Sequence, residues 1–154
     1  MKILQVAAVL LLAIAMAGGW AHLMELPNKM ALGREDYLTV QQIYRGWALL
    51  GFVIFGALIA IVAIAVLRRG EGAPFYFAVV AAACIVISLL VFFSMTFPTN
   101  QVTQNWTVLP GNWEILRRKW EYSHATGAIL YLIAMASLTL SIITGERRRN
   151  RILP

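Results

Sequence analysis

The stretch GWALLGFVIFGALIAIVAIAVL, residues 46–67, decides the fold class, because it carries no charged side chain along its whole length. A helix needs about 20 apolar residues to cross the hydrocarbon core of a bilayer. Three further runs, residues 3–24, 73–97 and 125–145, have the same character. They lack the period-two alternation of barrel strands, so helices are predicted. We therefore expect an all-α integral membrane protein, with residues 1–154 forming a single four-transmembrane-helix bundle.

The composition also favours a membrane protein, since 60% of the residues are hydrophobic and only 13% are charged. A soluble core of this size cannot bury so much apolar surface. The net charge is +6, and much of the excess lies beside apolar runs, at Arg68-Arg69 and within residues 147–151. Because no aromatic residues interleave with these basic ones, we expect the lipid bilayer as partner and no nucleic acid. The single cysteine, Cys84, lies in an apolar run and is expected to be a packing residue.

The first run has a second interpretation as a cleaved signal peptide, because Lys2 precedes it and Ala15-Met16-Ala17 resembles a cleavage site. A retained span is favoured, since apolarity continues past that point and four helices close a bundle. With four spans both termini lie on one side, which holds seven basic residues against six on the other. The tight basic clusters beside the spans predict cytoplasmic N- and C-termini.

The two connections expected on the outer side are long, residues 25–45 and 98–124, whereas the cytoplasmic connection is a short turn. Functional groups often gather on long loops above a rigid scaffold. Within the second loop, Asn112 is the predicted N-cap of a short amphipathic helix that runs into the last span. The outer end of the bundle is therefore where a site is expected.

The only two histidines each have a glutamate three residues away, as His22 with Glu25 and His124 with Glu121. Residues three apart share one face of a helix. Both pairs lie at the outer ends of their spans, and the first and fourth helices of a bundle are commonly neighbours, so we expect the pairs to meet. The other two spans bring further polar residues to this end, among them Tyr44, Arg45 and Asn100. A polar cup open toward the outer leaflet is therefore predicted.

Three chemistries fit two such pairs. A single metal ion held by His22, Glu25, Glu121 and His124 would suit non-haem iron, zinc or copper. A haem between the two histidines is the second option. The third needs no cofactor, because a carboxylate can orient an imidazole that acts as a general base near neutral pH. A purely structural role stands beside these, with both pairs facing headgroups and the tryptophans of residues 106–120 forming an interfacial belt.

The segment NWEILRRKWEYSHATGAIL, residues 112–130, resembles the signature of a four-helix membrane family that includes the anthrone oxygenases. That family has long been catalogued as a domain of unknown function. The matching positions are Trp113, Leu116-Arg117, Trp120-Glu121 and His124, with Asn100 or Asn105 upstream. The resemblance covers the whole architecture, while the specific motif lies in the last third of the chain. The stretches HLMELPNKM and QQIYRGW, residues 22–30 and 41–47, resemble a bacterial branch of the family, which implies the inner (plasma) membrane of a bacterium.

The resemblance implies a cofactor-independent monooxygenase that oxidises a lipophilic phenolic anthrone to a quinone with molecular oxygen. In that chemistry His124 is the base, Glu121 orients it, and Arg117 or a second arginine holds the phenolate. Residues expected to contact the substrate are Trp113, Trp120, Arg45, Asn100 and Tyr44.

The pair of His22 and Glu25 is not part of that signature, so a metal or haem stays open as an alternative to a site without cofactor. The second class of function is accordingly a non-catalytic membrane protein that binds metal or haem, or a structural subunit or carrier. A bundle this small also has the free surface to form a homodimer.

Overall fold

The computed structural model describes the backbone of residues 1–152 and the side chains of residues 1–148, so Arg149 and Arg151 of the basic tail lie outside the described side chains. The elements are α1 (Lys2–Ala31), α2 (Arg34–Gln41), two 3₁₀ turns (Gln42–Tyr44 and Trp47–Leu49), α3 (Leu50–Leu67), α4 (Ala73–Val91), a π-helical turn (Phe92–Thr96), α5 (Phe97–Val102) and α6 (Trp113–Ile152). No strand occurs within the described residues, and the predicted all-α class is confirmed.

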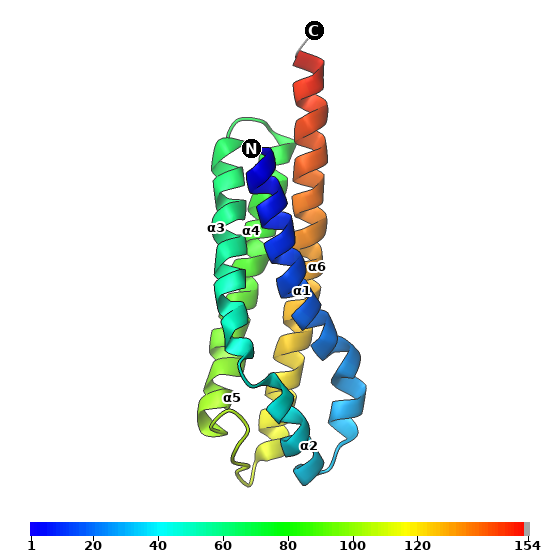
Figure 1. Cartoon of the computed structure of the whole chain (residues 1–154), viewed down its shortest axis with the longest axis vertical. Coiled ribbons are helices and arrows are strands. Elements are labelled where there is room, and N and C mark those ends of the chain that lie inside the picture. The colour runs from blue at the N-terminus through cyan, green and yellow to red at the C-terminus, as the bar shows by residue number, and fades with distance from the viewer. Residues whose placement is uncertain (153–154) are drawn as a thin grey trace.

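Four long segments stand side by side and close a ring (Figure 1). α1 packs on α3 and α6, and α4 packs on the same two helices, so each helix has two antiparallel neighbours. The segments long and apolar enough to cross a membrane are Lys2–Ala31, Trp47–Leu67, Ala73–Val102 and Trp113–Arg148. The chain is therefore an integral membrane protein with four spanning helices, and the expected contact between the first and the fourth is confirmed.

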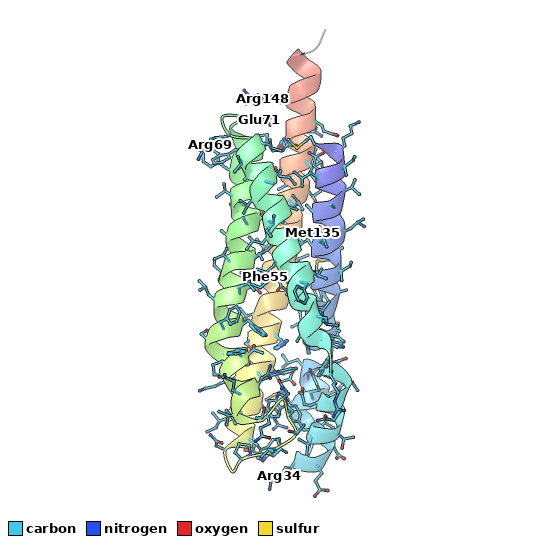
Figure 2. The ribbon with its side chains drawn as sticks, turned by 60° about the vertical axis from the view of Figure 1, so that its left-hand side comes forward. Arg34, Phe55, Arg69, Glu71, Met135 and Arg148 are labelled. Atoms are coloured by element: carbon cyan, nitrogen blue, oxygen red, sulfur yellow. The ribbon has the colours of Figure 1, made fainter. Side chains whose placement is uncertain are left out.

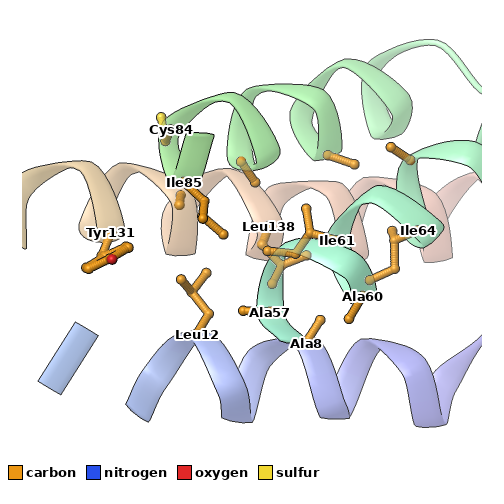
Figure 3. Close-up of a cluster of buried hydrophobic side chains, with 14 residues drawn as sticks. Ala8, Leu12, Ala57, Ala60, Ile61, Ile64, Cys84, Ile85, Tyr131 and Leu138 are labelled. Carbon is orange, nitrogen blue, oxygen red and sulfur yellow. The ribbon is translucent and has the colours of Figure 1, made fainter. Parts of the chain in front are cut away.

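Small side chains let the four helices approach one another closely. Buried alanines come from every long helix, and Leu12, Ile61 and Leu138 fill the spaces between them (Figure 3). Gly19 of α1 faces α6, where a Cβ would lie 3.1 Å from the Cα of Ala128. Many large apolar side chains on the outer faces are exposed, as expected where lipid is the solvent.

Three of the spanning helices extend beyond the apolar runs of the sequence. α1 continues through Pro27, whose missing N–H leaves one carbonyl without its helical partner, and ends at Ala31. α4 continues through the π-helical turn and α5 to Val102. α6 begins at Trp113 and runs unbroken through the predicted fourth span. The added turns lie at the end where α2 packs and carry polar residues beyond the apolar bundle (Figure 1).

The two ends of the bundle differ in chemistry (Figures 1 and 2). Both termini and the α3–α4 turn lie at one end, here called the terminal end, where Arg68 pairs with Glu71 at 3.1 Å and Arg148 donates to the Glu71 carbonyl. Arg68 crosses over Gly145, where any Cβ would overlap its guanidinium. The opposite end, here called the α2 end, carries Arg34 and the candidate site.

Candidate functional site

A cavity of about 720 Å³ lies at the α2 end of the bundle. All four spanning segments and the 41–48 connection contribute to its wall. The lining combines imidazoles with aromatic and polar side chains, chiefly His22, Tyr44, Trp47, Asn100, Trp120 and His124. A cavity of this volume accommodates a small organic molecule of several rings.

The two histidines meet in this cavity, as their positions in the sequence predict. The ring centroids of His22 and His124 are 4.2 Å apart, with the rings inclined by 63°. Trp120 stacks on His124 at 4.1 Å and 27°, and meets His22 edge-on at 5.0 Å. Tyr44 packs on the His22 ring with a centroid distance of 4.5 Å. Aromatic contacts on several sides fix both imidazoles in place.

The backbone determines which nitrogen of His124 carries the proton. Its Nδ1 lies 2.9 Å from the carbonyl oxygen of Trp120. A carbonyl oxygen only accepts, so Nδ1 is the donor and Nε2 keeps its lone pair. The neutral form of His124 therefore carries its proton on Nδ1 and has Nε2 as its basic atom.

An ion pair lies directly behind the histidines, outside the cavity lining. The ammonium of Lys29 is 2.9 Å from Oε2 of Glu121, and the two side chains are only 3% and 0% exposed. The other Glu121 oxygen accepts from the Tyr37 hydroxyl at 2.9 Å and from Nε2 of Gln41 at 3.2 Å. A buried pair of this kind persists only when hydrogen bonds satisfy its remaining atoms, as they do here.

Lys29 also connects the ion pair to the cavity. Its Nζ lies 3.2 Å from Nδ1 of His22 and 3.1 Å from the Tyr44 hydroxyl. That hydroxyl in turn donates to Glu25, which also pairs with Lys29 at 3.5 Å. The three protons of the ammonium therefore have three acceptors, on Glu121, His22 and Tyr44.

The two tyrosines of this network are held in the protonated form. Burial raises the pKa of the Tyr37 phenol far above its usual value, and the Glu121 carboxylate beside it adds to the shift. Burial likewise raises the pKa of Tyr44, together with its hydrogen bond to Glu25. Both phenols consequently act as hydrogen-bond donors to carboxylates at all ordinary pH values.

Irregular backbone is concentrated at the wall of the cavity. Three consecutive residues, Gln104, Asn105 and Trp106, have left-handed conformations with φ of 50°, 55° and 62°. Such a conformation costs a non-glycine residue about 1–2 kcal/mol. The Trp106 amide donates to Oγ1 of Thr103 at 3.1 Å, which helps to hold the turn. The π-helical turn Phe92–Thr96 also contributes to the lining, and both kinds of irregularity are frequent at functional sites.

The structure separates the predicted site residues into two groups. Those that line the cavity are His124, Trp120, Tyr44, Arg45 and Asn100, with Asn100 Oδ1 accepting from Nε1 of Trp120 at 2.9 Å. Arg117 instead donates to the Leu32 carbonyl at 2.8 Å and lies over the ring of Trp113 at 4.6 Å. Neither Arg117 nor Trp113 belongs to the lining, because both pack against the end of α1 and α2. The Glu121 carboxylate engages Lys29 and α2, while His124 is oriented by a backbone carbonyl.

The donors for a metal or haem are arranged unfavourably. Among the described residues, no three or more His, Cys, Asp or Glu side chains are grouped to hold a metal ion. The Lys29 ammonium lies between His22 and Glu121, where such an ion would sit, and its charge repels a cation. A haem between His22 and His124 requires space for the macrocycle, but their rings are in contact at 4.2 Å. This geometry favours neither group at the histidines.

The sequence did not reveal two residues of the buried network next to the cavity, Lys29 and Tyr37. Lys29 contacts His22, and Tyr37 holds Glu121. Lys29 falls within residues 25–45, which the sequence predicts as a loop, although it lies four residues after Glu25 and seven after His22, on the same helical face. This shared helical face could not be recognised, because a proline such as Pro27 marks a helix end more often than a helix interior. Tyr37 carries no local signal, since its partner Glu121 is 84 positions away.

Comparison of the chain with protein-family models, with curated proteins and with solved structures finds no match.

Proposed function

We propose that this protein is a membrane-embedded oxygenase that oxidises a lipophilic aromatic molecule, of the anthrone type, with molecular oxygen. The observation that carries the proposal is the orientation of His124, whose Nδ1 is held by a backbone carbonyl so that Nε2 is its basic atom, in an aromatic-walled cavity within a membrane bundle. An imidazole held this way suits general-base chemistry near neutral pH.

The chemistry requires only a base and oxygen. Nε2 of His124 takes a proton from a CH₂ group that a ring carbonyl makes acidic. The carbanion gives two electrons to O₂ and forms a C–O bond, and the imidazolium returns its proton to the peroxide. Loss of water from this hydroperoxide breaks the O–O bond and leaves a carbonyl, so that CH₂ and O₂ become C=O and H₂O. His124 ends the cycle neutral.

The cavity wall supports a flat, ring-containing substrate. Trp47, Trp120 and Tyr44 contribute aromatic surface to the wall, and an aromatic contact adds about 0.5–1.5 kcal/mol to the binding of a ring. Asn100 and Arg45 offer polar groups in the same wall. In this proposal Arg45, rather than Arg117, holds the phenolate oxygen, because Arg45 lines the cavity.

The proposal places both termini in the cytoplasm of a bacterium and the cavity in the outer half of its inner membrane. The basic residues at the terminal end support this orientation. A substrate that partitions into lipid is then already concentrated around the bundle.

Turnover by the purified protein tests the proposal. Wild type in detergent, supplied with anthrone and dissolved oxygen, is expected to consume O₂ and form the quinone. His124→Ala should lower kcat by roughly 10²–10⁴, the usual contribution of a positioned base. The matched control is Tyr122→Phe on the same helix, whose side chain is 54% exposed and outside the cavity lining.

Two results would overturn the proposal. Normal turnover in a folded His124→Ala protein would remove His124 as the base. Tight binding of anthrone by wild type, seen as quenched tryptophan fluorescence, without any oxygen uptake would identify a carrier instead.

A further inference from the structure

The hydrogen bond between Lys29 and His22 has only one possible direction, from the ammonium to the imidazole. An ammonium nitrogen has no lone pair, so it donates and never accepts. The ion pair with Glu121 at 2.9 Å and the contact with Glu25 at 3.5 Å keep Lys29 in this charged form. The nitrogen it faces, Nδ1 of His22 at 3.2 Å, must therefore be an acceptor without a proton.

The neighbouring imidazoles consequently have opposite tautomers. A neutral His22 that accepts at Nδ1 carries its proton on Nε2, whereas His124 donates from Nδ1 and has a bare Nε2. Both rings line the same cavity, and Lys29 does not. One histidine can therefore donate to a bound molecule at the place where the other can accept.

We propose that Lys29 is a positioning residue that holds His22 as an Nε2–H donor to a substrate oxygen while His124 removes the neighbouring proton. This inference rests on the proposed function and adds the electrophilic partner that the base requires. The chemical group recognised is a carbonyl, enol or phenol oxygen conjugated with an acidic C–H, as the carbonyl and the CH₂ of an anthrone are. Such a group needs one donor and one acceptor close together, and the two rings are 4.2 Å apart.

The donor matters when the proton leaves carbon. The electron pair of the broken C–H bond moves onto the substrate oxygen, and the hydrogen bond from His22 strengthens as that negative charge develops. His22 keeps its proton throughout, and Lys29 transfers none. The ammonium in contact with Nδ1 is the charge nearest the ring and makes Nε2–H a stronger donor, and the rings of Tyr44 and Trp120 flank the imidazole.

The carboxylates have a defined part in this arrangement. Glu121 and Glu25 hold the Lys29 ammonium in place, and Tyr37 and Gln41 hold the Glu121 carboxylate. Glu121 therefore acts on the chemistry through Lys29 and His22.

Nitrogen NMR of the histidines tests the tautomers without any need for turnover. Protein labelled with ¹⁵N-histidine should show one imidazole protonated at Nε2 and one at Nδ1, assigned by His22→Gln and His124→Gln. Lys29→Met should remove the Nε2–H preference of His22 and leave His124 unchanged. Because Lys29→Met leaves a buried carboxylate unpaired, the double variant Lys29→Met/Glu121→Gln, which removes both charges, serves as the folded counterpart. Lys119→Met on an exposed position of α6 is the control.

A wild-type spectrum with His22 protonated at Nδ1 would overturn the proposal. An unchanged His22 signal in the double variant would do so as well.

Kinetics give a second, independent readout. The amide of His22→Gln can still donate a hydrogen bond, so it should retain at least tenfold more kcat than His22→Ala, with similar KM. Loss of a single oxyanion donor costs about 10²–10³ in kcat. Equal losses in the two His22 variants would contradict a donor role. If wild type shows the opposite tautomers but oxidises no anthrone, the proposed function fails while the role of Lys29 stands.

Discussion

At the scale of single residues, the site depends on phenols that stay protonated. Tyr37 is fully buried and donates to Glu121 at 2.9 Å, while Tyr44 donates to Glu25. A hydrogen bond to a charged group contributes about 1.5–3 kcal/mol, and more is lost when the carboxylate is left without a donor. These tyrosines therefore bear on stability as well as on the position of Lys29.

Alkaline pH should unfold the protein through these two tyrosines. Their raised pKa means that the folded state binds the phenolic protons more tightly than the unfolded chain. This stabilisation is complete below the unfolded value of about 10 and is lost as the pH rises above it. The thermal midpoint of wild type should fall between about pH 10 and pH 11, and the fall should be smaller in Tyr37→Phe.

Tyr122→Phe is the matched control for that measurement, because Tyr122 lies on α6 with its ring exposed. It should keep the wild-type pH dependence. An identical alkaline fall in Tyr37→Phe would show that the Tyr37 proton does not contribute.

At the scale of elements, the C-terminal end of α1 is held by α6. Nη1 of Arg117 donates to the Leu32 carbonyl oxygen at 2.8 Å. The same nitrogen lies 3.5 Å from the Lys29 carbonyl oxygen. These carbonyls lie in the last turn of α1 and at its C-cap, where intrahelical donors run out. Within the described residues, the Lys29 carbonyl otherwise has only the Leu32 amide at 3.4 Å. Arg117 thereby supports the turn of α1 that carries Lys29.

Arg117→Gln should loosen this turn without unfolding the bundle. Hydrogen exchange of the amides of residues 29–41 is expected to accelerate by roughly ten- to a hundredfold, the equivalent of losing a charged hydrogen bond of about 1.5–3 kcal/mol. Amides in α3 and α4 should exchange as in wild type. Arg118→Gln, an exposed neighbour, is the control, and equal effects of the two variants would refute the role given to Arg117.

At the scale of the whole molecule, polar groups gather at the two ends of an apolar bundle, and the cavity lies at only one of them. The terminal end carries Arg69, Arg148 and the Arg68–Glu71 pair, and the α2 end carries Arg34 and the cavity (Figure 2). The proposed orientation therefore puts the cavity and the terminal end on opposite faces of the membrane.

Thiol labelling of intact cells checks that orientation. In a Cys84→Ala background, which removes the single and buried native thiol, Arg34→Cys should react with a membrane-impermeant maleimide from outside. Arg69→Cys should react only after the cells are opened. The reverse pattern would place the cavity on the cytoplasmic side.

The sequence allowed some polar contacts to be predicted and concealed others. His22 and His124 were expected to meet because each lies at the end of a span and the first and fourth helices adjoin. The link from Lys29 to His22 was concealed by Pro27, through which α1 continues. The separation of Arg117 from the cavity could not be foreseen, since it depends on where α1 ends.

The sequence by itself determined that the chain is a four-helix membrane bundle. Long apolar segments in lipid satisfy their backbone hydrogen bonds only as helices or closed barrels, and the pattern excludes the barrel. Only the tertiary structure decided which polar groups pair. The Glu121 carboxylate binds Tyr37, 84 positions away, because α2 folds back over the bundle. Local sequence periodicity does not predict how α2 packs. Pairing of buried polar groups is a property of how distant segments pack, whereas crossing a membrane is a property of each segment alone.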